Sequence, residues 1–320
     1  MYPAVQLPAG LPSKEETQMD FVKNFKRWHI VALAIIVITL IACAALGGLR
    51  TGVVYAGGTL ISINVKTEFD TTVIASALSE NGVPGALVQT AGDRHNIADI
   101  RLQYSGDADG LASSVAQTIA KTYPGAKVVS AQSITAARPD QLFLSLFVPA
   151  VSVCAIALLY AWARYGIHAG ISAGLMVIYT LALLFGVTGV VRLPVDPPFV
   201  SAWLLTAVCS VYSVHMLFER LKEIYQNDPQ ADKRRRELTN AGIRGSLPRM
   251  VSLAGALIVA LAGLAIFGGA SLREFALPAI IGLVVCVFTT TFLAAPLWII
   301  RQEKAGLKPA VQKKKADKKK

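Results

Sequence analysis

The sequence predicts a polytopic α-helical membrane protein with six transmembrane helices and a small ferredoxin-like α/β (βαββαβ) extracytoplasmic domain between the first and second helix. Hydrophobic residues make up 54% of the 320 residues and charged residues only 16%, with a mean hydropathy of +0.52. This composition is too apolar for a water-soluble protein of this size. The apolar residues gather in blocks that can supply the ~20 helical residues needed to cross a bilayer. One long polar segment, 51–141, interrupts them and shows strand-like alternation.

Each apolar block predicts one membrane span. Backbone amides in lipid must be hydrogen-bonded within the protein, and the blocks lack the alternation of barrel strands, so we expect helices. The expected spans, with ends uncertain by a few residues, are His29–Gly48, Leu142–Ala163, Ala169–Val191, Val200–Leu217, Val251–Phe267 and Leu277–Ile300.

The basic residues predict the orientation. Lys and Arg gather before the first span, between the fourth and fifth, and after the sixth, whereas 51–141 has six of them against eight acids, a net charge of −2. Short cytoplasmic loops carry the excess of Lys and Arg. We therefore expect a multi-pass membrane protein with both termini in the cytoplasm. The net charge of +11 then reflects topology, and no nucleic-acid partner is expected, because no aromatic and basic binding surface accompanies it.

These spans divide the chain into five parts. We expect a cytoplasmic segment 1–27, a first transmembrane helix 28–49, an extracytoplasmic domain 50–141, a five-helix membrane domain 142–300 and a basic disordered tail 301–320. The tail carries nine Lys or Arg against two acids. It is interpreted as a solvated tail that reinforces the topology. The alternative is contact with anionic lipid headgroups, ribosomal RNA or an acidic partner.

The four cysteines do not predict a cofactor, a metal site or a disulfide. All of them fall inside expected spans, without metal-ligand spacing, and are interpreted as packing residues. Leu40-Ile41-Ala42-Cys43 fits the pattern that precedes a lipidated cysteine. Against lipidation of Cys43, the segment before the apolar run is long, and small and apolar residues continue to Gly48.

The polar segment predicts a βαββαβ order of elements, which is the split, ferredoxin-like arrangement. Residues 60–66 alternate, with Ile61, Ile63 and Val65 on one face of a strand. A helix follows over Asp70–Asn81, capped by Asp70 and ended by Gly82, with four apolar residues on one face: Val73, Ile74, Ala77 and Leu78. The remaining elements are strands at Ala86–Thr90 and Ile97–Tyr104, a helix at Ala108–Tyr123 and a strand at Lys127–Gln132. His95 has no Cys or His at ligand spacing, so we expect a surface histidine.

Two glycine motifs carry a family resemblance. Tyr55-Ala56-Gly57-Gly58-Thr59 resembles the Asp-Phe-Thr-Gly-Gly-Thr signature of SecD and SecF proteins. Phe267-Gly268-Gly269, with the Leu272, Phe275 and Gly282 that follow, resembles the SecF stretch that joins the last two spans. Three further residues lie ahead of it at the family's spacing: Asn240, Ser246 and Arg249. With one span, a small outside domain and five more spans, residues 20–300 resemble the SecF half of the bacterial SecDF complex.

This resemblance implies a fold of the resistance-nodulation-division type and a role in protein export. It implies an accessory, non-enzymatic subunit that works with a SecD-like membrane subunit, the Sec translocon channel and an unfolded preprotein. In that family, proton flow through intramembrane Asp and Arg residues is thought to drive the outside domains. An ionisable group in lipid is costly and usually serves such a pathway.

The sequence departs from the family at those charged positions. The fourth-span Asp that carries protons in the family falls on Ser213, and a third-span His-Asp pair falls on Tyr179-Thr180. Only Arg249 remains of the expected charges. The working hypothesis is therefore a structural half that supports export, with proton coupling weakened here or carried by the partner.

Two interpretations of the remaining polar residues stay open. Tyr212, His215 and Glu219 share one helix face and, with Arg249, are candidates for a substitute proton relay. Alternatively, His215 forms hydrogen bonds within the bundle, Glu219 and Arg220 form an interfacial pair, and Arg249 extends to the headgroups. A different function, half of a small-molecule or lipid exporter of the same superfamily, is disfavoured because the single outside domain is small.

Overall fold

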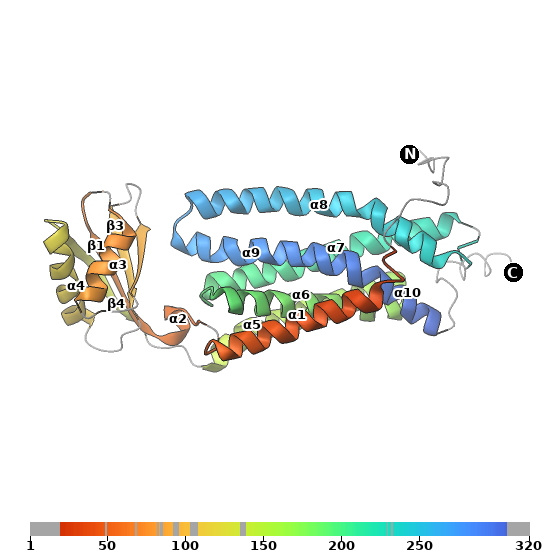
Figure 1. Cartoon of the computed structure of the whole chain (residues 1–320), viewed down its shortest axis with the longest axis horizontal. Coiled ribbons are helices and arrows are strands. Elements are labelled where there is room, and N and C mark those ends of the chain that lie inside the picture. The colour runs from red at the N-terminus through yellow and green to blue at the C-terminus, as the bar shows by residue number, and fades with distance from the viewer. Residues whose placement is uncertain are drawn as a thin grey trace.

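The computed structural model has a bundle of long helices with a small sheet domain at one end (Figure 1). The described residues are 20–48, 50–67, 69–81, 83, 86–91, 96–102, 108–134, 139–228, 230–231 and 233–305. The start of α1 (Phe25–Ala45) and the end of α10 (Ala295–Lys304) both lie at the end of the bundle far from the sheet domain.

The described part of the chain contains six helical segments long and apolar enough to cross a membrane, as predicted. The first five are single helices: α1 Phe25–Ala45, α5 Pro139–Tyr165, α6 Ile167–Val191, α7 Pro197–Asn227 and α8 Arg235–Phe267. The sixth consists of α9 Ala270–Thr289, a π-helical turn η1 Thr290–Ala294 and α10 Ala295–Lys304. This composition makes the chain a multi-pass membrane protein.

Two helices extend well past the expected spans. α7 continues from Leu217 to Asn227, and α8 begins at Arg235 rather than near Val251. The sequence analysis placed span ends where apolar residues stop, but a helix continues for as long as its backbone hydrogen bonds and side-chain contacts allow. The extensions carry Arg, Lys and Glu side chains beyond the apolar region.

The six crossings differ in how much of their surface other helices cover. α6 and the last crossing are the most enclosed, whereas α1, α5 and α8 keep most of their apolar surface exposed. Ile30, Val151 and Val259 are 64%, 64% and 73% exposed. In a membrane protein such side chains face lipid, which explains the apolar composition.

Small residues let helices approach closely in the bundle. A Cβ atom at Gly282 of α9 would collide with Thr206 of α7, and one at Gly186 of α6 would collide with Thr39 of α1. Glycine at such contacts is typical of membrane helices, where close packing replaces the hydrophobic effect.

The sheet domain, 58–134, has the predicted βαββαβ order. Its elements are β1 Gly58–Asn64, α3 Thr71–Glu80, β2 Leu87–Ala91, β3 Ile97–Leu102, α4 Ala108–Thr122 and β4 Lys127–Ile134. All neighbouring strands are antiparallel, in the order β2-β3-β1-β4. A short helix that was not predicted, α2 Val53–Ala56, precedes β1.

The core of the sheet domain follows the predicted alternation. Ile61, Ile63 and Val65 are buried on one face of the sheet, together with Ile74 and Leu78 of α3. The prediction for Val73 is wrong, because its side chain is 42% exposed. Ile74 and Leu78, four residues apart, both face the sheet. The side chain of Val73 points about 100° around the helix axis from that of Ile74, toward solvent.

The N-cap of α3 is as predicted. Asp70 accepts a hydrogen bond from the backbone amide of Thr72 at 2.8 Å. The predicted helix end at Gly82, His95 and the last predicted strand residue Tyr104 lie outside the described residues.

Candidate functional site

A cluster of small polar side chains lies inside the bundle where the family resemblance placed charges. It joins Thr180 of α6, Ser210 and Ser213 of α7, and Cys286 and Thr289 of α9, and is called the hydroxyl cluster below. Thr180 Oγ1 lies 2.7 Å from Thr289 Oγ1 and 3.2 Å from Ser210 Oγ. The Cys286 thiol donates to Ser213 Oγ at 3.6 Å. All five residues are buried.

The hydroxyl cluster is polar but holds no Asp, Glu, Lys, Arg or His. Its members hydrogen-bond to one another or to their own helices; Thr180 Oγ1, for example, also donates to the carbonyl of Met176 at 2.8 Å. Buried hydroxyls cost little when they are paired in this way. The two positions on which the family's acids fall, Thr180 and Ser213, therefore belong to one neutral, hydrogen-bonded contact between three helices.

Sequence analysis did not identify Ser210, Cys286 and Thr289 as part of this cluster. It also missed His29 of α1, whose ring nitrogens lie 3.2 and 3.3 Å from the hydroxyl of Tyr179. The spacing along one helix shows which residues share a face, but not which residues of other helices lie at the same depth. Only the repeated occurrence of small hydroxyl residues within apolar spans could have suggested the cluster.

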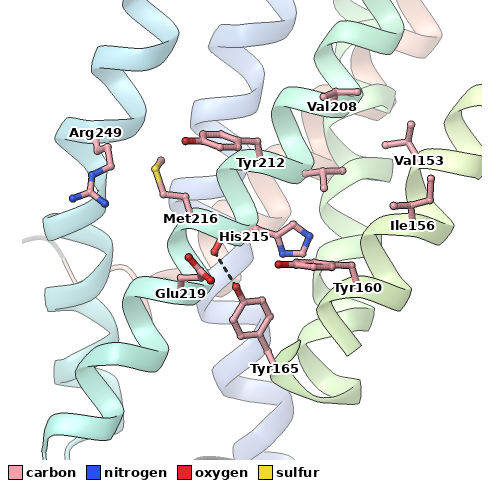
Figure 2. A pocket seen from close by; sticks show the side chains of 11 residues that line it. Val153, Ile156, Tyr160, Tyr165, Val208, Tyr212, His215, Met216, Glu219 and Arg249 are labelled. Atoms are coloured by element: carbon pink, nitrogen blue, oxygen red, sulfur yellow. Dashed lines mark hydrogen bonds between the residues drawn. The ribbon is translucent and has the colours of Figure 1, made fainter. Parts of the chain in front are cut away.

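The four relay candidates line one groove between α5, α7 and α8 (Figure 2). The groove has a volume of about 640 Å³ and contains the side chains of Tyr212, His215, Glu219 and Arg249. Arg249 lies 18 residues before the end of α8 at Phe267, about 27 Å along the axis. It is therefore near the boundary of the ~30 Å hydrocarbon core that is far from the sheet domain.

His215 does not form the hydrogen bonds that one interpretation expected. Its ring lies edge-on to Tyr160, with centroids 4.5 Å apart, and stacks on Tyr165 at 6.0 Å. Both ring nitrogens are buried without a hydrogen-bond partner among the described residues. The hydroxyl of Tyr165 instead donates to the backbone carbonyl of His215 at 3.5 Å. The aromatic rings therefore position the imidazole and enclose its two nitrogens.

The predicted Glu219–Arg220 pair is also wrong. Glu219 lies 3.5 Å from Arg164 at the end of α5, and Arg220 pairs with Glu223 at 2.7 Å. Adjacent residues of a helix point about 100° apart, so an i,i+3 partner or a neighbouring helix is the better match. Both pairs are well exposed, and such pairs contribute little to stability.

Arg249 is the exposed cation of the groove. Its side chain forms no hydrogen bond or ion pair within the part of the chain that the structure describes, and Tyr212 beside it is 55% exposed. A guanidinium at the edge of the hydrocarbon requires water, a headgroup or an acidic partner. The groove thus combines an uncompensated cation, a carboxylate and an imidazole without hydrogen bonds.

The first glycine motif shapes the entry to the sheet domain. Gly57 ends α2 with φ of 77°, a backbone conformation that favours glycine. Gly58 is the first residue of β1 and pairs with Ile134 of β4, and Thr59 is fully buried. These contacts give Gly57, Gly58 and Thr59 a structural role at the start of the sheet.

The second glycine motif lies where the sheet domain meets the bundle. Gly268 and Gly269 connect α8 to α9 and line a cleft of about 360 Å³ that β2 also lines. Beside the cleft, the guanidinium of Arg101 on β3 donates to both carboxylate oxygens of Glu274 on α9, at 3.1 and 3.3 Å. Asp196, at the start of α7, is 3.9 Å from Arg101. These contacts, named the outer junction, hold the sheet domain against two membrane helices.

No group of three or more His, Cys, Asp or Glu side chains among the described residues could hold a metal ion. Cys43 is buried near the end of α1.

The sequence matches one described protein family over more than half its length. The family "Protein export membrane protein SecD/SecF, C-terminal" matches residues 114–304. A protein translocase subunit SecF of Gemmatimonas aurantiaca is 25% identical over 300 residues, which are 86% of each chain. The SecF of Rhodobacter capsulatus is 23% identical, over 88% of each chain.

Some relatives are longer and contain a region similar to this chain as one part of their sequence. The protein translocase subunit SecDF of Bacillus subtilis is 21% identical over 88% of this chain but only 38% of its own length. A crystal structure of SecDF from Thermus thermophilus superposes with a TM-score of 0.67 at 18% identity, over 90% of this chain and 39% of that one. SecDF in the super-membrane-facing form gives a TM-score of 0.66 at 19% identity, over 95% and 40%. The chain thus spans about two fifths of the solved proteins whose fold it shares.

Proposed function

The chain belongs to the SecD/SecF family of protein-export membrane proteins, and from this premise we propose that it is a SecF-like accessory subunit of the Sec protein translocase. In this role it supports preprotein export across the bacterial inner membrane. The observation that carries the proposal is the match over 114–304, which runs from within α4 to the end of α10, together with SecF relatives aligned over 86% and 88% of their length.

The proposed orientation places the sheet domain outside the cytoplasm and both termini inside. Support comes from the excess of Lys and Arg at the end of the bundle far from the sheet domain. We assign 50–141 to an extracytoplasmic domain of the ferredoxin-like class. The strand order β2-β3-β1-β4 and the two helices between the strands support this assignment.

The proposed partners are a SecD-like membrane subunit, the Sec channel and an unfolded preprotein. In the SecDF relatives, the region that resembles this chain is covalently joined to a further region of the same polypeptide. The groove between α5, α7 and α8 supports a partner on that side, since an acidic side chain of a neighbouring subunit could pair with Arg249 there.

Proton coupling is proposed to be weak in this chain or to depend on the partner. The neutral hydroxyl cluster supports this view, because no member carries an acid at the family's positions. Arg249 is the residue of this chain through which a partner's acid would act.

The first experiment measures preprotein export in bacteria that lack their own SecF. We expect the wild-type chain to restore export and the His215→Ala variant to do so equally. We expect Arg249→Ala to fail, because it removes the cation available to an acidic partner, and Arg249→Lys to retain part of the activity. Export is measured by processing of a secreted reporter.

Membrane levels of each variant serve as the control. If wild type restores export and both alanine variants match it, the membrane part is a scaffold and coupling lies in the partner. If the wild type does not restore export while it accumulates in the membrane, the proposed function is wrong.

A further inference from the structure

The cleft at the outer junction runs along an edge of the sheet. In the described part of the chain, β2 pairs with β3 alone and is one end of the sheet. The consecutive residues Val88, Gln89 and Thr90 all line the cleft. Neighbouring side chains of a strand point to opposite faces, so a cleft that touches all three lies along the backbone edge of β2. Alternate N–H and C=O groups of an edge strand point outward, where another strand can pair with them.

The two edges of this sheet differ. The pairing of β4 with β1 shifts register near Val129, between the partners Val128 and Ser130. Such a bulge distorts an edge and disfavours further strand pairing. The pairing of β2 with β3 is regular over all five residues. Of the two edges, β2 is the better template for an added strand.

The wall opposite β2 is built from the outer ends of the membrane helices. Leu193, Pro194 and Leu277 supply apolar contacts, and Gly268-Gly269 supplies exposed backbone. A Cβ atom at Gly269 would have no neighbour within 4 Å. Gln89 donates to Glu274 at 3.2 Å, and Arg101 binds the same carboxylate, so the walls are held at a fixed separation.

We propose that this cleft binds an extended segment of the translocating polypeptide as an added strand on β2. This proposal rests on the proposed function and names the surface of the chain that contacts the preprotein. Main-chain hydrogen bonds to an edge strand do not depend on side chains, which suits a surface that meets many unfolded sequences. The apolar residues of the opposite wall add contacts that also discriminate little between sequences.

The test uses a photo-crosslinking amino acid at Thr90 of the full chain in membrane vesicles, with a preprotein arrested in the channel. The matched control carries the same group at Val129, which is 58% exposed on the bulged edge. We expect crosslinks to the preprotein from position 90 that exceed those from position 129 by about tenfold, the ratio that corresponds to 1.4 kcal/mol of binding free energy.

A second pair of variants tests whether the cleft itself is needed. Gly269→Trp fills open space in the cleft, whereas Gly255→Trp adds the same bulk at a position of α8 that also has no neighbour within 4 Å. We expect Gly269→Trp to abolish most crosslinking from position 90 and Gly255→Trp to leave it unchanged.

The outcomes separate this proposal from the function on which it rests. If the chain restores export but position 90 labels the preprotein no more than position 129, the cleft proposal is wrong and the proposed function stands. Crosslinks from position 90 to a SecD-like subunit, with or without preprotein, would also overturn it. Failure to restore export overturns both.

Discussion

At the scale of single residues, the hydroxyl of Thr180 is the centre of the hydroxyl cluster. It contacts Thr289 and Ser210 across two helix interfaces and the carbonyl of Met176 in its own helix. Side-chain hydrogen bonds between membrane helices contribute about 0.6 kcal/mol on average. The cluster therefore gives a moderate, local contribution to the packing of α6, α7 and α9.

This arrangement predicts the effect of removing one hydroxyl. We expect Thr180→Val to lower the melting temperature of the purified protein, by an amount that corresponds to about 0.5–1.5 kcal/mol. Ser201→Ala is the control, because Ser201 is exposed and bonds only to its own helix. Equal melting temperatures for Thr180→Val and wild type would show that the cluster does not stabilise the bundle.

Asp20 and Asn240 form a second polar contact of single residues, at the entrance of α1. The amide of Asn240 donates to Asp20 at 2.8 Å, and its oxygen accepts from the backbone amides of Phe21 and Val22 at 3.1 and 3.3 Å. Burial raises the pKa of Asp20, but hydrogen bonds from the Lys23 amide and Asn240 outweigh it and lower the pKa below the usual 3.8.

The lowered pKa of Asp20 sets a pH window for this contact. A carboxyl with a depressed pKa stabilises the folded state above its ordinary pKa, and that contribution is lost as the pH falls through the depressed value. We expect slow hydrogen exchange at the amides of Phe21 and Val22 from pH 7 down to pH near 4. Asn240→Ala should accelerate it throughout this range, and unchanged exchange in that variant would contradict the contact.

At the scale of elements, α7 and α9 depend on a close approach at Gly282. A Cβ atom there would collide with the side chain of Thr206. We expect Gly282→Ala to destabilise the protein by about 1–3 kcal/mol, as overpacking does. Thr206→Ala should remove the obstacle, so the double variant should be more stable than Gly282→Ala alone. A double-mutant cycle of thermal unfolding measures this coupling, and additive effects would contradict it.

The sequence predicted elements better than contacts between them. The period of two in 60–66 and the N-cap of α3 depend on neighbouring residues, so they can be recognised locally. The partner of Glu219 and the members of the hydroxyl cluster depend on the relative depth and rotation of distant helices. The π-helical turn η1 was also missed, although Pro296 gives a physical reason for it. Proline lacks an N–H and clashes with the carbonyl four residues earlier, at Phe292, so the helix must widen locally.

At the scale of the whole molecule, the outer junction fixes the sheet domain relative to the bundle. We expect Arg101→Ala to broaden the distance distribution between spin labels at Val129 and Phe267, both highly exposed. Arg101→Lys should give an intermediate width, because an ammonium can bind the Glu274 carboxylate but lacks the second nitrogen, which in Arg101 donates to the hydroxyl of Ser271 at 3.3 Å. The control is Arg273→Ala, since Arg273, among the described residues, donates its hydrogen bond to the carbonyl of Ile266 within the bundle at 3.4 Å. Equally narrow distributions for Arg101→Ala and wild type would show that other contacts hold the domain.

The insertion of the sheet domain between α1 and α5 limits the motions that remain once the outer junction opens. The chain enters the domain from α1 and leaves it into α5, and these two helices lie on one side of the bundle (Figure 1). A rigid body tethered at two nearby points can swing about the line that joins them but cannot easily translate. Arg101 and Glu274 meet on the side of α9, away from these tethers, so a rotation of the domain separates them. The Arg101–Glu274 ion pair, at a distance from both tethers, therefore limits how far the cleft along β2 can open.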